Sequence, residues 1–208
     1  GRAPLWVPEG RHSLGVDVAR YGDDESVIAH NIADALVNMW AYRKYDNVML
    51  AREVDLKATL HSVGNAFIKV DSIGVGSGVV DSLKHNHKRI VTEFVAGSKE
   101  STAGMSEKRK AQAARFKNFR TESWWQLRDA LFKDQYIIGP GVTGAALLKL
   151  TEDLTSIKYS VDSDKYLELE PKDETKKRLG RSPDYGDAAM QCFWKPQSAV
   201  FWAGITNR

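Results

Sequence analysis

The opening of the chain, read as strands and turns, limits the possible folds more than any other feature. Three short runs rich in β-branched and aromatic residues follow one another at residues 14–20, 27–32 and 36–45, and short turn segments containing Asp separate them. Runs of this kind with brief polar breaks are typical of strands joined as hairpins. The sequence therefore predicts three consecutive antiparallel strands at the start of the domain.

The next part of the chain changes to an alternation of helix and strand. Apolar residues recur at helical spacing over 50–64, and a buried-looking strand follows at 66–71. A glycine-rich turn leads to a short helix at 79–86, and residues 89–96 form a further expected strand. Strands connected through helices pair in parallel, so the sheet is predicted to be mixed and the fold to be α/β.

The second half of the chain predicts helices and one hairpin. Residues 97–106 have the composition of a mobile loop, and a long helix carrying Phe119, Leu127 and Leu131 on one side is expected after it. A helix at 145–154, a hairpin at 156–170, a loop at 172–186 and a closing amphipathic helix at 187–194 complete the prediction. We expect a linker remnant at 1–12, one domain at 13–197 and a C-terminal tail at 198–208.

Composition excludes several classes of protein. The 208 residues suit one domain with an added hairpin, and 42% hydrophobic and 27% charged residues are ordinary for a globular protein. No apolar run approaches the ~18 residues that span a bilayer, and the first residues lack a signal-peptide core. The single cysteine, Cys192, allows neither an internal disulfide nor a thiolate zinc cage, which indicates a reducing, cytoplasmic setting.

Three acidic residues recur at structurally similar places in the predicted elements. Asp17 lies within the first strand, Asp71 ends the fourth, and Asp187 begins the last helix. A carboxylate in an apolar strand is costly unless it is paired or binds a cation, and a group of carboxylates favours a hard divalent metal. Taken singly, each acid has a simpler explanation: an ion pair with Arg20, a turn at Asp71, and a helix cap at Asp187. As an ordered set they favour a metal site.

Four sequence blocks containing these acids occur in a fixed order. They are Gly15–Val27, with GVDVAR followed by GDD and SV; Asp71–Asp81, DSIGVGSGVVD; Phe116–Trp125, FKNFRTESWW; and Ser182–Ala188, SPDYGDA. Each block alone is weakly specific. Together they cover most of the chain and resemble the nuclease domain of phage terminase large subunits, which have a ribonuclease H-like fold.

The resemblance implies a two-ion site for phosphodiester hydrolysis. Asp17, Asp71 and Asp187 would be the catalytic residues and metal ligands, with Asp17 bridging the ions and Asp184 and Asp23 as secondary ligands. Oxygen-only ligands predict Mg²⁺ or Mn²⁺. The implied function is metal-dependent cutting of concatemeric double-stranded DNA during viral genome packaging in the host cytoplasm.

The resemblance also implies partners that this chain does not contain. The full protein would carry an N-terminal ATPase motor domain and would work with a portal and a small terminase subunit, away from any membrane. The chain has no phosphate-binding loop, and its glycines at 74, 76 and 78 do not match a dinucleotide fingerprint. Two alternatives stay open: another ribonuclease H-like nuclease, such as a junction resolvase or transposase, and a non-catalytic basic DNA-binding module.

Basic residues cluster before the third and fourth blocks. The net charge of +3 is weak evidence for nucleic acid, but local runs of lysine and arginine favour phosphate contact. A solvated surface is the commoner outcome for such runs. The residues predicted to contact DNA are Lys108, Arg109, Lys110, Arg120, Lys172, Lys176, Lys177 and Arg181.

Overall fold

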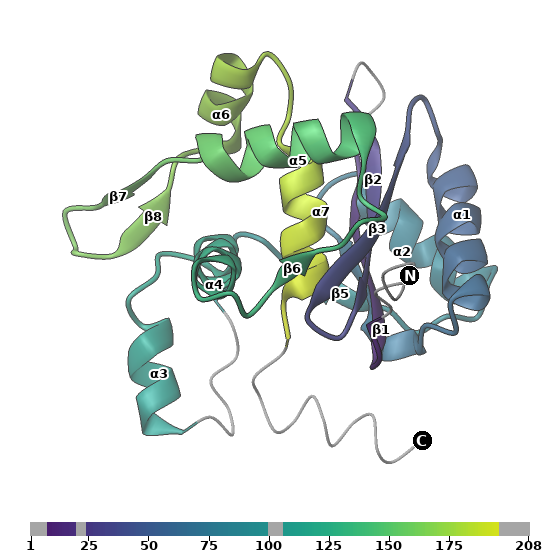
Figure 1. Cartoon of the computed structure of the whole chain (residues 1–208), viewed down its shortest axis with the longest axis horizontal. Helices are drawn as coiled ribbons and strands as arrows, with labels where there is room; N and C mark the ends of the chain where they lie inside the picture. The colour runs from purple at the N-terminus through teal and green to yellow at the C-terminus, as the bar shows by residue number, and fades with distance from the viewer. Residues whose placement is uncertain (1–7, 20–23, 100–105, 196–208) are drawn as a thin grey trace, which may run out of the picture.

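The computed structural model describes residues 8–19, 24–99 and 106–195 and contains a six-stranded mixed sheet (Figure 1). The first three strands are antiparallel, as predicted, and the outer ones pair in parallel: β4 with β1, β5 with β4, and β6 with β3. The sheet order is β5-β4-β1-β2-β3-β6. The strands are β1 His12–Asp17, β2 Ser26–Ile32, β3 Ala35–Tyr42, β4 Ile68–Asp71, β5 Thr92–Phe94 and β6 Ile137–Ile138.

Strands β1 and β4 bring two acids to one edge of the sheet. They run parallel with Val16 opposite Val70, so the residues that follow, Asp17 and Asp71, end the two strands side by side. Residues Leu14 to Asp17 of β1 are buried, which is usual for a central strand covered on both faces.

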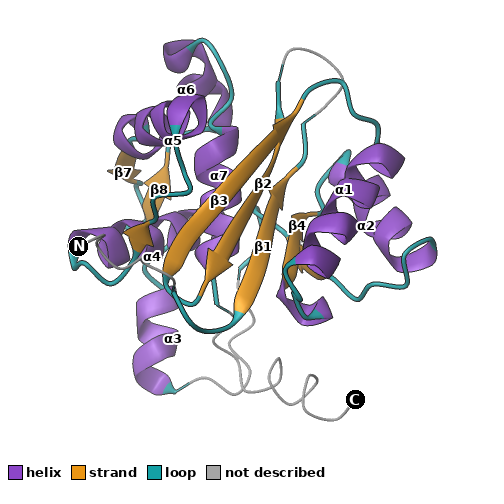
Figure 2. Ribbon diagram, turned by 45° about the vertical axis from the view of Figure 1, so that its right-hand side comes forward, coloured by secondary structure: helices purple, strands orange, loops and turns teal. Residues whose placement is uncertain are grey.

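Helices cover both faces of the sheet and give the domain two cores (Figure 2). Helices α1 and α2 pack on one face against Leu14, Val16 and Ile28. Helices α4, α5 and α7 pack on the other face against Val27, Ala29 and Leu36. The helices are α1 Asn47–Leu60, α2 Gly76–His85, α3 Glu107–Ala113, α4 Phe119–Phe132, α5 Gly144–Ser156, α6 Lys172–Leu179 and α7 Asp184–Phe193, with a 3-10 turn at Asn65–Phe67.

The closing helix that the sequence predicts is present as α7, and it lies at the centre of the domain. It begins at Asp184, and every residue from there to Cys192 is buried, because β1 and β2 cover one side while α4 and α5 cover another. The contact with β1 is backbone to backbone. A Cβ at Gly15 would overlap the main chain of Ala188 and Cys192, so the position requires glycine.

The predicted loop at 172–186 is wrong for residues 172–179, which form α6, and for residues 184–186, which begin α7. Asp173 and Glu174 lie in the first turn, basic residues fill the last turn, and Gly180 ends the helix in the left-handed region at φ 72°. These are favourable helix signals. The pattern was missed because α6 buries a single side chain, Thr175, and so has no apolar stripe.

The other predicted helices and strands are present, with boundaries that differ by a few residues. The long helix expected after residue 106 is two helices, because Asn118 starts a new one by accepting a hydrogen bond from the Thr121 N–H. The strand expected at 89–96 is reduced to β5. The predicted hairpin is present as β7 Tyr159–Val161 and β8 Leu167–Leu169. Residues 100–105, within the predicted loop, and the predicted tail at 198–208 lie outside the described residues.

Within the described residues, no helix is long and apolar enough to cross a membrane. Cys192 is a free, buried thiol whose Sγ contacts the Ser13 and Ala29 carbonyls.

Candidate metal centre

Three buried carboxylates surround one lysine ammonium at the edge where β1 and β4 end. The Lys172 Nζ lies 3.0 Å from Asp187 Oδ2, 3.4 Å from Asp17 Oδ2 and 3.6 Å from Asp184 Oδ1. A fourth carboxylate, Asp71, lines the same cavity of about 450 Å³ together with Lys172 and Asp187. The three acids predicted from the sequence as catalytic, and Asp184 as a secondary acid, are therefore brought together. Asp23 lies outside the described residues.

Local structure places each acid. Asp17 and Asp71 are the last residues of parallel neighbouring strands, and the Asp71 carboxylate accepts a hydrogen bond from the Ile73 N–H at 3.1 Å, which fixes the turn after β4. Asp184 and Asp187 are three residues apart in the first turn of α7, so their side chains share one face of the helix. The helix N-terminus also favours negative charge at these positions.

Burial makes this concentration of charge costly. Burial raises the pKa of Asp17 well above its usual value, Lys172 opposes the rise, and the carboxylates of Asp184 and Asp187 add to it. Burial likewise raises the pKa of Asp184 and that of Asp71. Ionising Asp17, Asp71 and Asp184 at this site is therefore unfavourable, and a bound divalent cation would offset that cost.

Asp187 differs from the other acids because donors surround it. Burial pushes its pKa upward, but Lys172, Arg120 and Trp124 outweigh that effect and hold the pKa at about 2. The Trp124 Nε1 donates to Asp187 Oδ1 at 2.8 Å, and the Arg120 guanidinium lies 3.4 Å from the same oxygen. Asp187 is therefore ionised at neutral pH and held in one orientation.

Trp124 belongs to the third sequence block and has a role that the sequence does not predict. Its side chain is buried, and its N–H donates to Asp187. Because a buried indole N–H needs an acceptor, a buried tryptophan in this block implies a hydrogen bond to a polar group nearby. Which acceptor it meets depends on the packing of α4 against α7, which no local pattern reveals.

The donor set fits a hard divalent cation. Four carboxylates supply oxygen ligands of the type that Mg²⁺ and Mn²⁺ prefer. Among the described residues, no three His, Cys, Asp or Glu side chains are arranged to hold a metal ion as they stand. The Lys172 ammonium lies between three of the carboxylates, 3.0 to 3.6 Å from each, where a cation would be placed. Its side chain is 37% exposed and has solvent on one side.

The other predicted DNA-contacting residues lie at different distances from this cluster. Of those that the structure describes, Arg120 and Lys172 are in it. Lys176 pairs with Asp24 near the edge of the cluster, and Lys177 pairs with Glu174 on the surface. Lys108 is exposed on α3, and Lys110 on the same helix pairs with Glu107. Arg181 pairs with Glu152 and Asp153. The side chain of Arg109 lies outside the described part of the structure.

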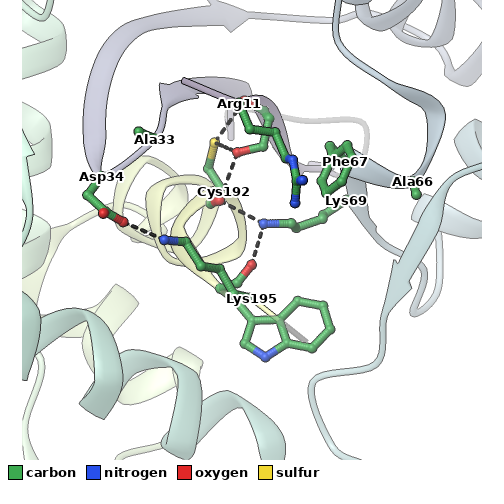
Figure 3. Close-up of a pocket in the computed structure, with 10 residues that line it drawn as sticks. Arg11, Ala33, Asp34, Ala66, Phe67, Lys69, Cys192 and Lys195 are labelled. Carbon is green, nitrogen blue, oxygen red and sulfur yellow. Dashed lines mark hydrogen bonds and ion pairs between the residues drawn. The ribbon is translucent and has the colours of Figure 1, made fainter. Parts of the chain in front are cut away.

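A second cavity, of about 340 Å³, lies at the opposite end of α7 (Figure 3). Its buried cation, Lys69, donates to the carbonyl of Cys192 at 2.8 Å and to that of Trp194. Burial lowers the pKa of Lys69 to about 8. Lys69 thus caps the carbonyls at the C-terminal end of α7, which accounts for its position without a ligand.

Comparison with known proteins gives matches in structure but not in sequence. No family model and no curated protein matches the chain. The nuclease domain of the large terminase subunit gp2 of bacterial virus Sf6 matches with a TM-score of 0.76 and 20% identity, over 92% of this chain and 91% of that one. A mutant form of the same domain with manganese gives the same values.

A further solved structure agrees on the fold. The large terminase nuclease from thermophilic phage G20c with bound magnesium matches with a TM-score of 0.55 and 15% identity, over 90% of this chain and 82% of that one. At these identities the likeness establishes the fold. The predicted ribonuclease H-like α/β fold is therefore confirmed, and it is the fold of terminase nuclease domains.

Proposed function

We propose that this chain is the nuclease domain of a phage terminase large subunit and cuts concatemeric double-stranded DNA with a divalent cation. One observation carries the proposal: Asp17, Asp184 and Asp187 converge on a single ammonium at the sheet edge, beside Asp71. The fold supports it, because terminase nuclease domains with this fold have been solved with manganese and magnesium.

The proposed ligands of the cation are Asp17, Asp71 and Asp187, with Asp184 as an auxiliary acid and Asp23 as a further predicted ligand. When bound, Mg²⁺ or Mn²⁺ supplies Lewis acidity for the attack of water on the phosphodiester and for departure of the 3′ oxygen. Asp17 would be the ligand shared by both ions, because it lies between Asp71 at the end of β4 and the two acids of α7.

The chain's own residues prepare the site for an anionic substrate. Trp124 and Arg120 keep Asp187 ionised and oriented. Arg120 also lines the cavity beside the acids, where a guanidinium can donate to a phosphate oxygen. Lys172 balances the carboxylates in the absence of a cation, and once displaced its ammonium is placed to contact the DNA backbone.

The proposed substrate contacts extend along the surface basic residues. Lys108 and Lys176 are exposed, and their side chains suit phosphate contact without base readout. A terminase nuclease domain would act on double-stranded DNA in the host cytoplasm. Its proposed partners are an N-terminal ATPase motor domain, a portal and a small terminase subunit.

Nicking of supercoiled plasmid tests the function. We expect wild-type protein to nick plasmid with Mn²⁺ or Mg²⁺ and to stop when a chelator is added. Asp17→Asn should abolish nicking while DNA binding persists, because binding rests on the basic residues. The matched control is Asp81→Asn, which changes an exposed acid on α2 and should nick as the wild type does.

Three other results of this experiment would favour a different function or a different site. A wild-type protein that binds DNA but never nicks it would be a non-catalytic DNA-binding module. Preferential cutting of four-way junctions over linear duplex would indicate a resolvase. Metal-dependent nicking that Asp17→Asn leaves unchanged would contradict the assignment of the site.

A further inference from the structure

The first turn of α7, which carries both Asp184 and Asp187, takes a hydrogen-bond partner from another helix. The first N–H groups of any helix lack partners within it, and Pro183 at the N-cap offers no side-chain hydrogen bond. The Gly186 N–H instead donates to the Asp153 carboxylate on α5, at 2.9 Å. Figure 1 shows α5 lying across this end of α7.

Asp153 is a fully buried carboxylate, with no side-chain exposure, that is fixed in place by an arginine. The Arg181 guanidinium lies 2.7 Å from Asp153 Oδ1. It also donates to Glu152 and to the Lys149 carbonyl, each at 2.9 Å, so it is held against α5 at several points. A buried charge of this kind is tolerable only when it is paired. The pair therefore forms a rigid support behind the α7 turn.

The packing around Gly186 shows how closely that support holds the turn. A Cβ at Gly186 would overlap the Trp124 ring on one helix and the Cβ of Asp153 on another. Trp124 also donates to the Asp187 carboxylate. The turn is thus held at its backbone by Asp153 and at its acidic side chain by Trp124.

We propose that Asp153 is a positioning residue of the nuclease site: it fixes the α7 turn so that Asp184 and Asp187 face Asp17. This inference rests on the proposed function. Asp153 does not touch the carboxylates that would bind the cation; it acts through the Gly186 N–H and the helix turn. Direct hydrogen-bond partners of metal-ligating side chains affect metal affinity by about 10–100-fold, and Asp153 acts one step further from the ligands, so we expect an effect at the lower end of that range.

The test is the Mn²⁺ affinity of the folded domain, measured by calorimetric titration well below the melting temperature. Asp153→Asn keeps the size of the side chain but loses the charge that pairs with Arg181. It also replaces one of the two acceptor oxygens with an NH2 group, which cannot accept from Arg181 or from the Gly186 N–H. We expect its Kd for Mn²⁺ to rise about tenfold. Asp81→Asn is the matched control, because it makes the same change at an exposed acid on α2 that takes no part in this support. Its Kd should equal that of the wild type.

A purely structural role for Asp153 predicts a different pattern. Asp153→Asn would then melt lower yet bind Mn²⁺ as the wild type does, and that result would overturn the proposal. If Asp153→Asn does not fold, as judged by circular dichroism, Arg181→Lys carries the test, since it weakens the support while keeping a positive charge. It should also raise the Kd, and an unchanged Kd would overturn the proposal equally.

Two further titrations separate this inference from the proposed function. If wild-type protein binds no Mn²⁺, the metal site itself is wrong, and the positioning role falls with it. If wild type binds Mn²⁺, Asp17→Asn does not, and Asp153→Asn binds like the wild type, the metal site stands and only the positioning role fails.

Discussion

Lys172 connects the charge of the acid cluster to the stability of the domain. Its ammonium is the shared counter-ion of Asp17, Asp184 and Asp187, and those carboxylates raise its pKa well above the usual value although burial opposes them. A group whose pKa is raised in the folded protein contributes stability below its unfolded pKa, so Lys172 stabilises the fold at neutral pH. The same contacts place it in competition with a divalent cation.

Lys172→Met should therefore weaken the metal-free protein and strengthen its response to metal. Removing one partner of a buried charge pair costs 3–5 kcal/mol, and partial exposure of Lys172 reduces the expected loss to roughly 1–3 kcal/mol. Melting in chelator measures the loss, and melting with Mn²⁺ should show a larger rise than in the wild type. Lys177→Met, which removes a surface pair with Glu174, is the control and should change little. A variant as stable as the wild type in chelator would show that Lys172 is not the counter-ion.

At the scale of helices and strands, the contact between β1 and α7 positions the site. Gly15 allows the two backbones to touch, which sets Asp17 against the first turn of α7. Gly15→Ala should destabilise the domain by about 3 kcal/mol or more, because main chain cannot move aside as a flexible side chain can. Gly97→Ala is the control, since a Cβ there meets nothing within 4 Å. Equal melting temperatures for the two variants would contradict this account of the packing.

The strand pattern was predictable because it is local, whereas the partners in the site were not. Alternating runs gave the antiparallel strands and the parallel pairing that brings Asp17 and Asp71 together. Lys172 lies 155 residues from Asp17 in the chain, and Trp124 lies 63 from Asp187, so no spacing rule links them. The two-residue strand β6 is too short to leave a pattern.

The histidines show the same limit. The ring centroids of His30 and His61 lie 4.4 Å apart, and His12 Nδ1 lies 3.0 Å from His30 Nε2, although the three residues are far apart in the sequence. Pairing of β1 with β2 brings His12 and His30 together, and α1 adds His61 just beyond its last residue. Burial lowers the pKa of His30 to about 3, so the ring is neutral at pH 7. The cluster is a product of tertiary structure.

Across the whole molecule, basic residues near the acid edge and on α3 define the proposed path of DNA. Neutralising Lys108, Arg109 and Lys110 together should weaken DNA binding and flatten its dependence on salt. Each lost phosphate contact should reduce the slope of log affinity against log salt by ~0.9. Fluorescence anisotropy over a range of salt concentrations measures the slope. An unchanged slope would show that α3 is a solvated surface away from DNA.

Melting curves of two proteins test most directly whether the acids at the sheet edge converge to hold a divalent cation. A cation that binds only the folded form adds about 2.7 kcal/mol at a hundredfold excess over its Kd, which is roughly 5–11 °C for a domain of this size. We expect Mn²⁺ to raise the melting temperature of the wild type and a chelator to reverse the rise.

Asp17→Asn supplies the decisive comparison. Burial raises the pKa of Asp17, and a carboxyl group whose pKa is raised on folding reduces stability once the pH exceeds its unfolded pKa. At neutral pH in chelator the variant should therefore melt higher than the wild type, while Lys172 keeps its contacts with Asp184 and Asp187. With Mn²⁺ the variant should gain less than the wild type. If both proteins respond equally to the ion, or if the variant melts lower in chelator, the carboxylates do not form a metal site.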